Sequence, residues 1–538
     1  MRSLVVTLAL VALLVSPAAV PPASGTSDAG RPDRESPRVH AVYPDPVAAG
    51  DRGEFVVLAV PNDTRLGRYA ITDGHSTARL PNATASGHVV LTGDPARVRN
   101  LTDRPVYGVA DAPALANGGD TVRLLRGGTA VHTVRYRESS EGEVGVANGS
   151  VVRWRPLGAT DRPVVTDRGG RVRVFALPDA PRAPLAAVRD ADERLYLAGY
   201  TLTSRRVADA LVAAHRRGVD VRVLLEGKPV GGRTRAGART LDRLVAAGVE
   251  VRLVAGPYAR YRYHHAKYAV ADDRAVVLTE NWKPAGVGGN SSRGWGVATG
   301  QSRVVDGLAG TFRADAGWRD AVPWSTFRRG RRFERGGRAD ATYPERFDPE
   351  TVPVERTDLL VTPDNAQRAL VGELDAAEAS IAVVQPTVGD WDGPLLRALR
   401  RAADRGVETR LLLSSAWYVR EENRRTVERF TAWADRTGAP LSAKLAAPGG
   451  RYAKIHAKGA VVDDRVVVGS LNWNEAAATR NREVLLVLHG DEAAAYFRRV
   501  FDADWRGGRP RLPLGLGAAV AGVLAVAGLA ARRVRFEE

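Results

Sequence analysis

The chain has 538 residues, which is too long for one ordinary hydrophobic core, so we expect more than one domain. It contains no cysteine, and this excludes disulfides, thiol nucleophiles and zinc sites built on thiolates. The formal net charge of +17 favours polyanionic partners, either nucleic acid or an anionic membrane surface, without choosing between them.

The N-terminus has the order of a secretory signal. Arg2 precedes an apolar run from Leu4 to Val15, and a stretch rich in small residues continues to Gly25. A charged start, a short apolar run and small residues are typical of an export signal, and the apolar run is short for a membrane span. We therefore predict a signal peptide at residues 1–25.

Residues 38–137 have the pattern of a β-sandwich. Short apolar runs alternate there with turns rich in Asn, Asp, Gly and Pro. The segment Gly53-Glu54-Phe55-Val56, together with a later segment that begins at Leu115, resembles the lamin-tail domain. The resemblance includes no catalytic motif and implies a module for binding or spacing.

An internal duplication follows. Residues 260–282 match residues 451–473 at 14 of 23 positions, with a constant offset of 191. Upstream, residues 217–225 match residues 405–413 at an offset of 188. The repeat is therefore half of a domain, and not one isolated motif.

Both copies predict the same order of elements. The expected strands and helices are 194–202, 206–217, 219–225, 242–247 and 249–254 in the first copy, and 380–384, 394–405 and 407–413 in the second. Strands that alternate with helices indicate a largely parallel sheet covered by helices. The expected fold is an α/β pseudo-dimer with halves at 170–320 and 356–508, joined by a basic linker at 321–355.

Each copy contains a histidine and a lysine two residues apart, with an aspartate five residues later. Imidazole acts as a nucleophile or an acid near neutral pH, and a lysine ammonium binds phosphate oxygens. Only six of the 78 basic residues are lysines, yet both motifs contain one. The candidate catalytic residues are His265, Lys267, Asp272, His456, Lys458 and Asp463, and Asn281 and Asn472 are candidate phosphate-binding residues.

These motifs resemble the phospholipase D (PLD) superfamily, whose signature is H-x-K-x(4)-D followed by Gly-Ser-x-Asn. The second copy matches fully, whereas the first has Leu278-Thr279 in place of Gly-Ser. The resemblance therefore adds Ser470 and Thr279 to the candidate phosphate-binding residues. Glu483 resembles the downstream acid that orients a histidine in this family, and the matching region of the first copy, residues 292–295, has no such acid. The resemblance covers roughly residues 170–508.

The resemblance implies a phosphohistidine intermediate, with His265 as the nucleophile, His456 as the acid, and neither a metal nor a cofactor. Three classes of function stay open. Nucleic acid is slightly favoured as the substrate because of the net charge and of arginines between Arg328 and Arg338 that alternate with aromatic residues, although these arginines equally fit a solvated linker. The alternatives are a phospholipase D or phosphatidyltransferase acting on phospholipid, and an inactive surface-anchored binding protein.

The C-terminal segment from Leu512 to Ala531 is uncharged, and Arg532, Arg533 and Arg535 follow it directly. About 20 apolar residues are enough to cross a bilayer as a helix, and positive charge marks the cytoplasmic side. We therefore expect a transmembrane helix at 512–531 in a single-pass protein of the cell membrane, with the catalytic domain outside the cell. A buried core helix is the alternative.

Overall fold

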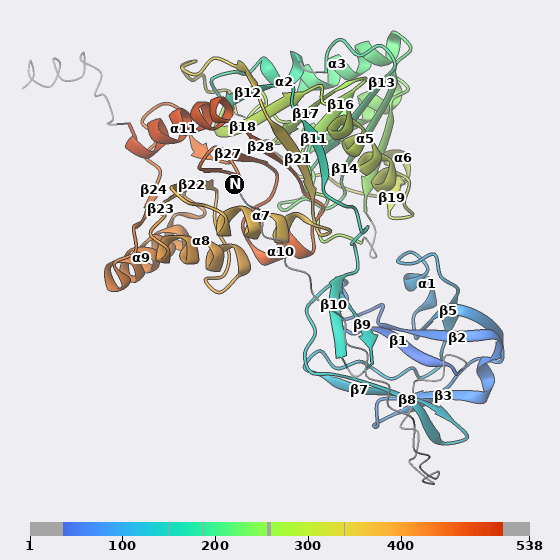
Figure 1. Ribbon diagram of the computed structural model, residues 1–538. Helices are drawn as coiled ribbons and strands as arrows, with labels where there is room; N and C mark the ends of the chain where they lie inside the picture. The colour runs from blue at the N-terminus through green and yellow to red at the C-terminus, as the bar shows by residue number, and fades with distance from the viewer. Residues whose placement is uncertain (1–35, 150, 187, 256–259, 338, 509–538) are drawn as a thin grey trace, which may run out of the picture.

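The computed structural model describes residues 36–149, 151–186, 188–255, 260–337 and 339–508. The chain forms a β domain, drawn in blue and teal in Figure 1, and two α/β halves that pack against each other. The predicted signal peptide, residues 1–25, lies outside the described residues.

The β domain consists of two packed sheets. The six-stranded sheet has the order β10-β9-β1-β2-β5-β6, the four-stranded sheet has the order β4-β3-β7-β8, and one apolar core joins them. Because β9 and β10 belong to the larger sheet, the domain extends past the expected boundary at residue 137. The elements are β1 (Arg38–Tyr43), β2 (Phe55–Arg65), β3 (Tyr69–Thr72), β4 (Thr77–Arg79), β5 (Thr84–Thr92), α1 (Pro95–Val98), β6 (Val106–Gly108), β7 (Asp120–Arg126), β8 (Thr129–Tyr136), β9 (Glu143–Asn148) and β10 (Val151–Pro156), with a 3-10 turn at Leu66–Arg68.

The first α/β half has the core strand order β15-β14-β13-β16-β17-β18. The chain enters it through β12, which pairs with β18. Its elements are β12 (Arg171–Leu177), α2 (Ala183–Ala186), β13 (Arg194–Gly199), α3 (Arg205–Arg216), β14 (Asp220–Glu226), α4 (Arg235–Ala246), β15 (Glu250–Val254), β16 (Tyr268–Ala271), β17 (Arg274–Leu278), β18 (Ser292–Thr299), α5 (Ser302–Ala316), β19 (Ala321–Pro323) and α6 (Trp324–Phe327).

The second half repeats this order as β24-β23-β22-β26-β27-β28. Its elements are β21 (Arg356–Val361), α7 (Ala366–Asp375), β22 (Ser380–Gln385), α8 (Pro394–Asp404), β23 (Glu408–Leu413), α9 (Arg420–Thr437), β24 (Leu441–Leu445), β25 (Lys454–Ile455), β26 (Gly459–Val462), β27 (Arg465–Gly469), α10 (Glu475–Thr479), β28 (Val484–His489) and α11 (Asp491–Arg506). The predicted two-half α/β fold is therefore confirmed.

The sheets are mixed, and not largely parallel as expected. In each half three neighbouring strands, β13, β14 and β15 or β22, β23 and β24, are parallel to one another. The following strands form antiparallel hairpins, because the chain turns back at Asp272 and Asp463, which both have a positive φ of 50°. The sequence predicted parallel strands because helices connect the parallel strands of each half. The short strands after each histidine are connected by hairpin turns instead, so they are antiparallel.

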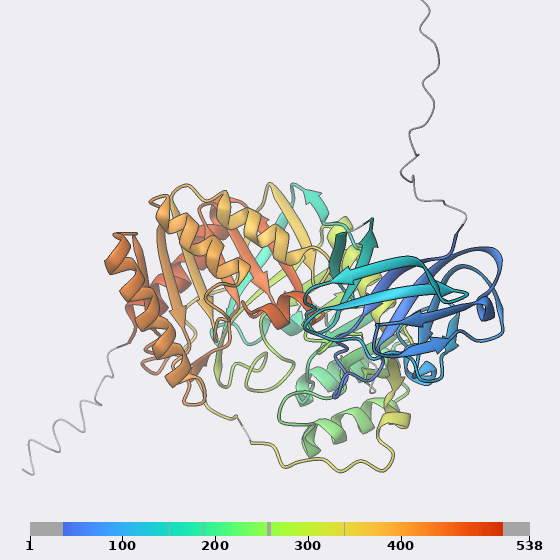
Figure 2. The ribbon, with the colours of Figure 1, turned by 90° about the horizontal axis from the view of Figure 1, so that it is seen from below.

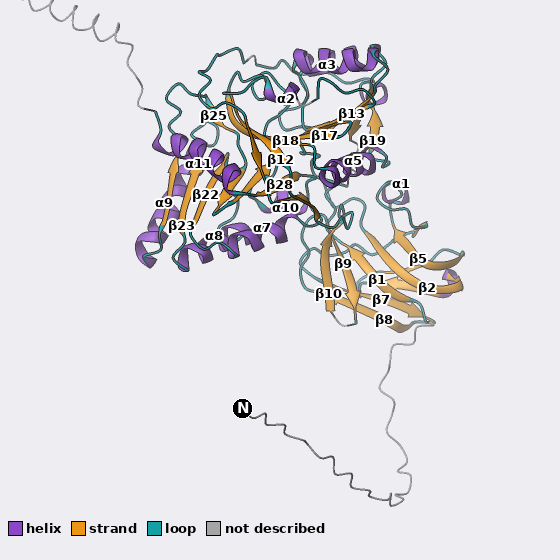
Figure 3. Cartoon of the chain, turned by 45° about the horizontal axis from the view of Figure 1, so that its top comes forward, coloured by secondary structure: helices purple, strands orange, loops and turns teal. Residues whose placement is uncertain are grey.

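The two halves share a core. Helices α5 and α11 contribute to one apolar cluster that contains buried residues from both sheets, whereas α3 and α4, or α8 and α9, belong to separate outer clusters. Figure 3 shows α11 on the side of its sheet away from α7 and α8. Two strands are also exchanged, since β11 (Val165–Arg168) pairs with β21 and β20 (Glu350–Pro353) pairs with β12. The halves are therefore one folding unit.

Two buried arginines join the halves in a pseudo-symmetric way. The Nε atom of Arg482 lies 3.0 Å from Asp315 in α5 of the first half. The Nε atom of Arg293 lies 2.8 Å from Asp504 in α11 of the second half. Each arginine immediately precedes the position of the histidine-orienting acid, so this interface also fixes the site.

The linker between the halves runs along the lower edge of both of them in Figure 2, in yellow. Residue Glu334 accepts a hydrogen bond from the backbone of Arg235, and the side chain of Asn290 donates one to the carbonyl of Ala341, 2.9 Å away. The linker thus contacts the first half at the start of α4 and at the loop before β18.

None of the helices in the described part of the chain is long and apolar enough to cross a membrane. The segment 512–531, where the transmembrane helix was expected, lies outside the described residues. The expectation of a single-pass membrane protein with an extracellular catalytic domain is therefore corrected. It rested on an uncharged run that contains Pro513 and four glycines, and lack of charge alone does not establish a helix.

Candidate active site

The two histidines lie at the junction of the halves. The backbone N–H of His265 donates to the carbonyl of Arg482, and the backbone N–H of His456 donates to the carbonyl of Arg293, both at 2.9 Å. Strand β25, which ends directly before His456, pairs in parallel with β18 of the first half. Each histidine is therefore held against the half that does not contain it.

His265 is fixed by a carboxylate from the opposite half. Its Nδ1 atom lies 2.9 Å from both carboxylate oxygens of Glu483. The side chain of Asn481 donates to the same carboxylate at 2.9 Å. The ring of Tyr200 meets the imidazole edge to face, with 4.8 Å between centroids. With Nδ1 occupied by Glu483, Nε2 is the nitrogen left for chemistry.

The charge states around His265 suit a nucleophile. Burial lowers the pKa of His265 to about 4, against the opposing effect of Glu483. The pKa of Glu483 itself is lowered despite burial, because His265 and neighbouring donors favour its charged form. At neutral pH the site therefore holds a neutral imidazole beside an ionised carboxylate.

His456 also has a carboxylate beside it, which the sequence analysis missed. The Nδ1 atom of His456 lies 3.2 Å from Oε2 of Glu280, although the two are not aligned as a hydrogen bond. Glu280 comes from the first half and is only 2% exposed. Burial raises its pKa to about 7, and the nearby Lys458 opposes this rise. Alignment of the two copies places the counterpart of Glu483 among residues 292–295, where no acid occurs. Glu280 lies elsewhere in the sequence, directly after Thr279, so the alignment does not indicate it.

The two motif lysines lie buried beside the histidines. The Nζ of Lys267 donates to the carbonyl of His265 at 2.5 Å, and that of Lys458 donates to the carbonyl of His456 at 2.7 Å. Burial lowers the pKa of both lysines, that of Lys458 to about 8. An anion bound between them would offset this penalty, because its negative charge favours the ammonium form.

The candidate hydroxyl residues bind backbone. The N–H of Trp295 donates to Oγ1 of Thr279 at 2.9 Å, and the N–H of Val484 donates to Oγ of Ser470 at 3.0 Å. Thr279 thus makes the same contact to β18 that Ser470 makes to β28. The structure places both hydroxyls in the scaffold next to the site. Asn281 and Asn472 are partly buried at the following turns, and Oδ1 of Asn281 has no hydrogen-bond partner among the described residues.

The motif aspartates lie at the hairpin turns, at the far end of β16 and β26 from the lysines. The carboxylate of Asp272 accepts backbone hydrogen bonds from residues 192, 193 and 194 at 2.7–3.0 Å. That of Asp463 accepts the same set from residues 378, 379 and 380 at 2.8–3.0 Å. They anchor the start of β13 and β22, and the structure does not bring them to the histidines.

One group of side chains in the described residues has the spacing of metal ligands, namely Asp358, Glu373 and His489. Both carboxylates are already paired, because Arg356 lies 3.0 Å from Asp358 and Arg465 lies 2.8 Å from Glu373. These contacts supply the positive charge that a cation would bring.

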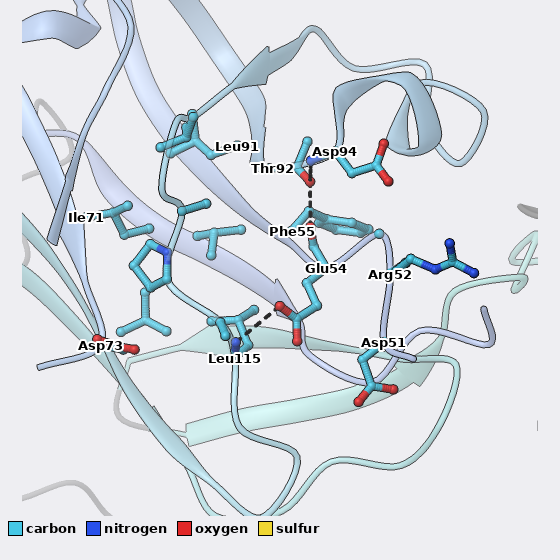
Figure 4. Close-up of a pocket in the computed structure, with 18 of the residues that line it drawn as sticks. Asp51, Arg52, Glu54, Phe55, Ile71, Asp73, Leu91, Thr92, Asp94 and Leu115 are labelled. Carbon is cyan, nitrogen blue, oxygen red and sulfur yellow. Dashed lines mark hydrogen bonds between the residues drawn. The ribbon is translucent and has the colours of Figure 1, made fainter. Parts of the chain in front are cut away.

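The β domain contains a cavity of about 220 Å³ between its sheets, shown in Figure 4. Glu54 lies at its edge and accepts a hydrogen bond from the N–H of Leu115 at 3.3 Å. Burial raises the pKa of Glu54 to about 7. The segment that resembles the lamin-tail domain therefore forms a wall of this cavity and fastens the loop before β7. The lamin-tail resemblance itself stays a prediction.

Comparisons with known proteins agree with the duplicated fold. The family model described as "Cardiolipin synthase, PLD-like domain" matches residues 185–315 and 370–505. No curated protein sequence matches the chain. Similar solved structures include phosphatidylserine synthase from Haemophilus influenzae Rd KW20, 13% identical with a TM-score of 0.46, where the match covers 61% of this chain and 84% of that chain. They also include the phospholipase D family member Nuc from Salmonella typhimurium, 23% identical with a TM-score of 0.24, where it covers 28% of this chain and 95% of that chain.

Each of the two matched regions contains one copy of the histidine–lysine motif, His265 with Lys267 and His456 with Lys458. The regions also coincide with the two α/β halves, whose strand orders are the same. The chain therefore contains two regions that match a PLD-like domain, one in each half.

Proposed function

We propose that the paired domains form one phosphodiester-cleaving site that works through a phosphohistidine. The observation that carries this proposal is the pair of histidines at one junction, His265 buried and His456 partly buried, each beside a lysine and a carboxylate. Such a set supplies a nucleophile, an acid and positive charge for a phosphate group. An inactive binding protein would have no need for two buried, charged sets of this kind.

In the proposed mechanism, Nε2 of neutral His265 attacks phosphorus. The bond from phosphorus to the leaving oxygen breaks, and His456 in its imidazolium form gives a proton to that oxygen. Burial and the nearby Lys458 lower the pKa of His456 well below its ordinary value in the free protein, and the negative charge of the bound phosphate opposes this effect by favouring the imidazolium. His456, now neutral, then takes a proton from water or an alcohol, which attacks the phosphohistidine and restores His265. Lys267 and Lys458 neutralise the phosphate oxygens in both steps. Water gives hydrolysis, and an alcohol gives transfer.

The rim of the site favours a phospholipid substrate. The loops after β14 and β23 occupy equivalent positions in the halves, and both expose apolar side chains: Val230 is 76% exposed, Trp417 85% and Tyr418 51%. The N–H of Val230 donates to the Tyr200 hydroxyl at 2.6 Å, and Tyr200 packs on His265. Exposed aromatic residues beside cations are typical of a surface that contacts the lipid headgroup region.

The second loop contacts the segment that leads to the other histidine. The Nζ of Lys454 donates to the Tyr418 hydroxyl at 3.2 Å, and Lys454 is two residues before His456. The sequence analysis favoured nucleic acid because of charge, whereas these loops place exposed apolar side chains in both halves. The description of the matched family points to the same class of substrate.

Nucleic acid remains the second candidate. The basic linker carries exposed arginines along the first half, and the net charge of +17 favours any polyanion. A nuclease would bind its substrate through these charges, and its activity would fall steeply with salt.

The test compares three substrates with the full chain. They are anionic phospholipid vesicles, single-stranded DNA and bis(p-nitrophenyl) phosphate, which is soluble and small. We expect turnover of vesicles and of the small phosphodiester, and we expect Trp417→Ala to reduce only the former. Val131→Ala, which changes an exposed valine of β8, is the matched control. Cleavage of DNA without turnover of vesicles would reject the lipid proposal and keep the phosphodiesterase.

A further inference from the structure

Two positions differ between the halves in a reciprocal manner. Leu278 pairs with Gly296 across β17 and β18, whereas the equivalent pair across β27 and β28 is Gly469 and Leu485. The leucine thus lies on the earlier strand of the pair in the first half and on the later strand in the second half, and the glycine lies opposite it in both. The departure from Gly-Ser at Leu278 is thus compensated on the neighbouring strand, so the first half keeps the same packed volume.

The same exchange occurs at the acids. Glu280 of the first half corresponds to Leu471 of the second, and Gly294 corresponds to Glu483. The first half therefore has its acid on the turn after β17, and the second half has its acid directly before β28. Each half contains one acid in this pair of positions.

The space around Gly294 shows that Glu280 occupies the place of a side chain at position 294. A Cβ atom added to Gly294 would lie 2.3 Å from Cγ of Glu280 and 2.8 Å from Oε1. Both atoms belong to one buried side chain, which fills the volume that position 294 leaves empty. A glutamate cannot stand at 294 while Glu280 is present.

We propose, on the basis of the proposed function, that Glu280 is the positioning residue of His456 and replaces the acid that position 294 lacks. Its carboxylate reaches His456 from the turn after β17, as the carboxylate of Glu483 reaches His265 from the position before β28. Glu280 touches no reacting atom. It sets which nitrogen of His456 carries the proton and keeps Nε2 directed at the leaving oxygen.

The two acids are held differently, and this difference fits the different roles of the two histidines, nucleophile for His265 and proton donor and acceptor for His456. Glu483 binds His265 with both oxygens and has Asn481 as a further donor, whereas Glu280 approaches His456 through one oxygen at 3.2 Å. A tightly held ionised partner makes His265 a better nucleophile. A looser partner leaves His456 free to give up and regain its proton in the two steps.

The test moves the acid between strands. Glu280→Leu copies the residue at 471 and removes the carboxylate, and Glu280→Leu/Gly294→Glu rebuilds the arrangement of the second half. With a phosphodiester that has an alkyl leaving group, we expect Glu280→Leu to lower turnover about 10-fold to 100-fold, within the usual contribution of acid catalysis. The double variant should recover most of this loss.

The leaving group separates positioning from general damage. The release of p-nitrophenolate in the first step needs no proton, so Glu280→Leu should lower that step much less than it lowers release of an alkyl group. An equal loss with both leaving groups, or a folded double variant no more active than Glu280→Leu, would overturn the proposal.

Magnetic resonance of the histidine nitrogens gives a readout that needs no turnover. The tautomer of His456 should change in Glu280→Leu and return in the double variant. If the wild-type chain cleaved no phosphodiester, the proposed function would fail, and this measurement would still decide the place of Glu280. An unchanged His456 signal in Glu280→Leu would reject the inference.

Discussion

The two halves have the same strands in the same order, and yet they build their histidine sites differently. In the second half the acid precedes β28 and binds His265 with both oxygens, whereas in the first half it follows β17 and approaches His456 with one. Because neighbouring strands place side chains in one shared volume, an acid can come from either strand. Both halves therefore place a carboxylate beside a histidine, although the glutamate comes from a different position in the sequence of each half.

Loss of either histidine should have the largest effect and should test whether the halves are equally needed. We expect His265→Ala and His456→Ala each to lower turnover of a phosphodiester with an alkyl leaving group by at least about 10³-fold. Steady-state rates with the purified full chain measure this. A variant that kept a tenth of the activity would show that one half suffices.

Loss of the acids should have a smaller and unequal effect. We expect Glu483→Gln to lower turnover about 100-fold and Glu280→Gln about 10-fold, because His265 depends on a two-oxygen contact and His456 on a looser one. Circular dichroism controls for folding. Equal losses would remove the asymmetry proposed for the two halves.

The pH dependence sharpens the same comparison. Since burial lowers the pKa of His265 to about 4, its imidazole stays neutral and nucleophilic well below pH 6.5. Since the pKa of Lys458 is lowered to about 8, its positive charge is lost above that pH. With bis(p-nitrophenyl) phosphate, whose leaving group needs no proton from His456, we expect kcat/KM to fall below about pH 4 and above about pH 8. An acidic limb near pH 6.5 would contradict a buried nucleophile.

Chelation should leave the activity intact. Two lysines provide the positive charge around the phosphate group, so we expect EDTA to change turnover less than about 2-fold. Activity that is lost with EDTA and returns with a divalent cation would show that a metal takes part.

The smallest effect on catalysis should come from the motif aspartates. Asp272→Asn and Asp463→Asn weaken hydrogen bonds to the start of β13 or β22, so we expect each to lower the free energy of unfolding by about 1 kcal/mol and to leave kcat unchanged. Because the folded-state pKa of both carboxyls is lowered, this stability is present above their unfolded pKa and is lost as the pH falls. Denaturant titrations at pH 7 and pH 3 measure both effects.

Much of the fold was predictable from the sequence because the duplication shows itself in identical residues. The repeated Arg-Tyr, His-x-Lys and Asp-Asp-Arg segments located both hairpins and both histidines, and helix periodicity located α3 and α8 within one or two residues. The resemblance also predicted Glu483 as an acid that orients a histidine, but it did not say that this histidine would be His265 of the other half.

Other features depend on contacts that no pattern along the chain records. Glu280 became a partner of His456 only because Gly294 leaves room for it, and that is a contact between strands. The aspartates looked catalytic because they belong to the motif, but a turn with positive φ directs them to backbone amides. The exposed side chains of Val230, Trp417 and Tyr418 form a rim only after the halves assemble.

The most direct test of the central claim is to trap the covalent intermediate on His456→Ala. With bis(p-nitrophenyl) phosphate the first step needs no acid, whereas the second step lacks its base, so the phosphohistidine should accumulate. We expect a burst of one equivalent of p-nitrophenolate. An alkaline quench preserves the acid-labile phosphohistidine, and mass spectrometry should then place the phosphoryl adduct on His265. Turnover without any adduct, or an adduct on another residue, would contradict the account.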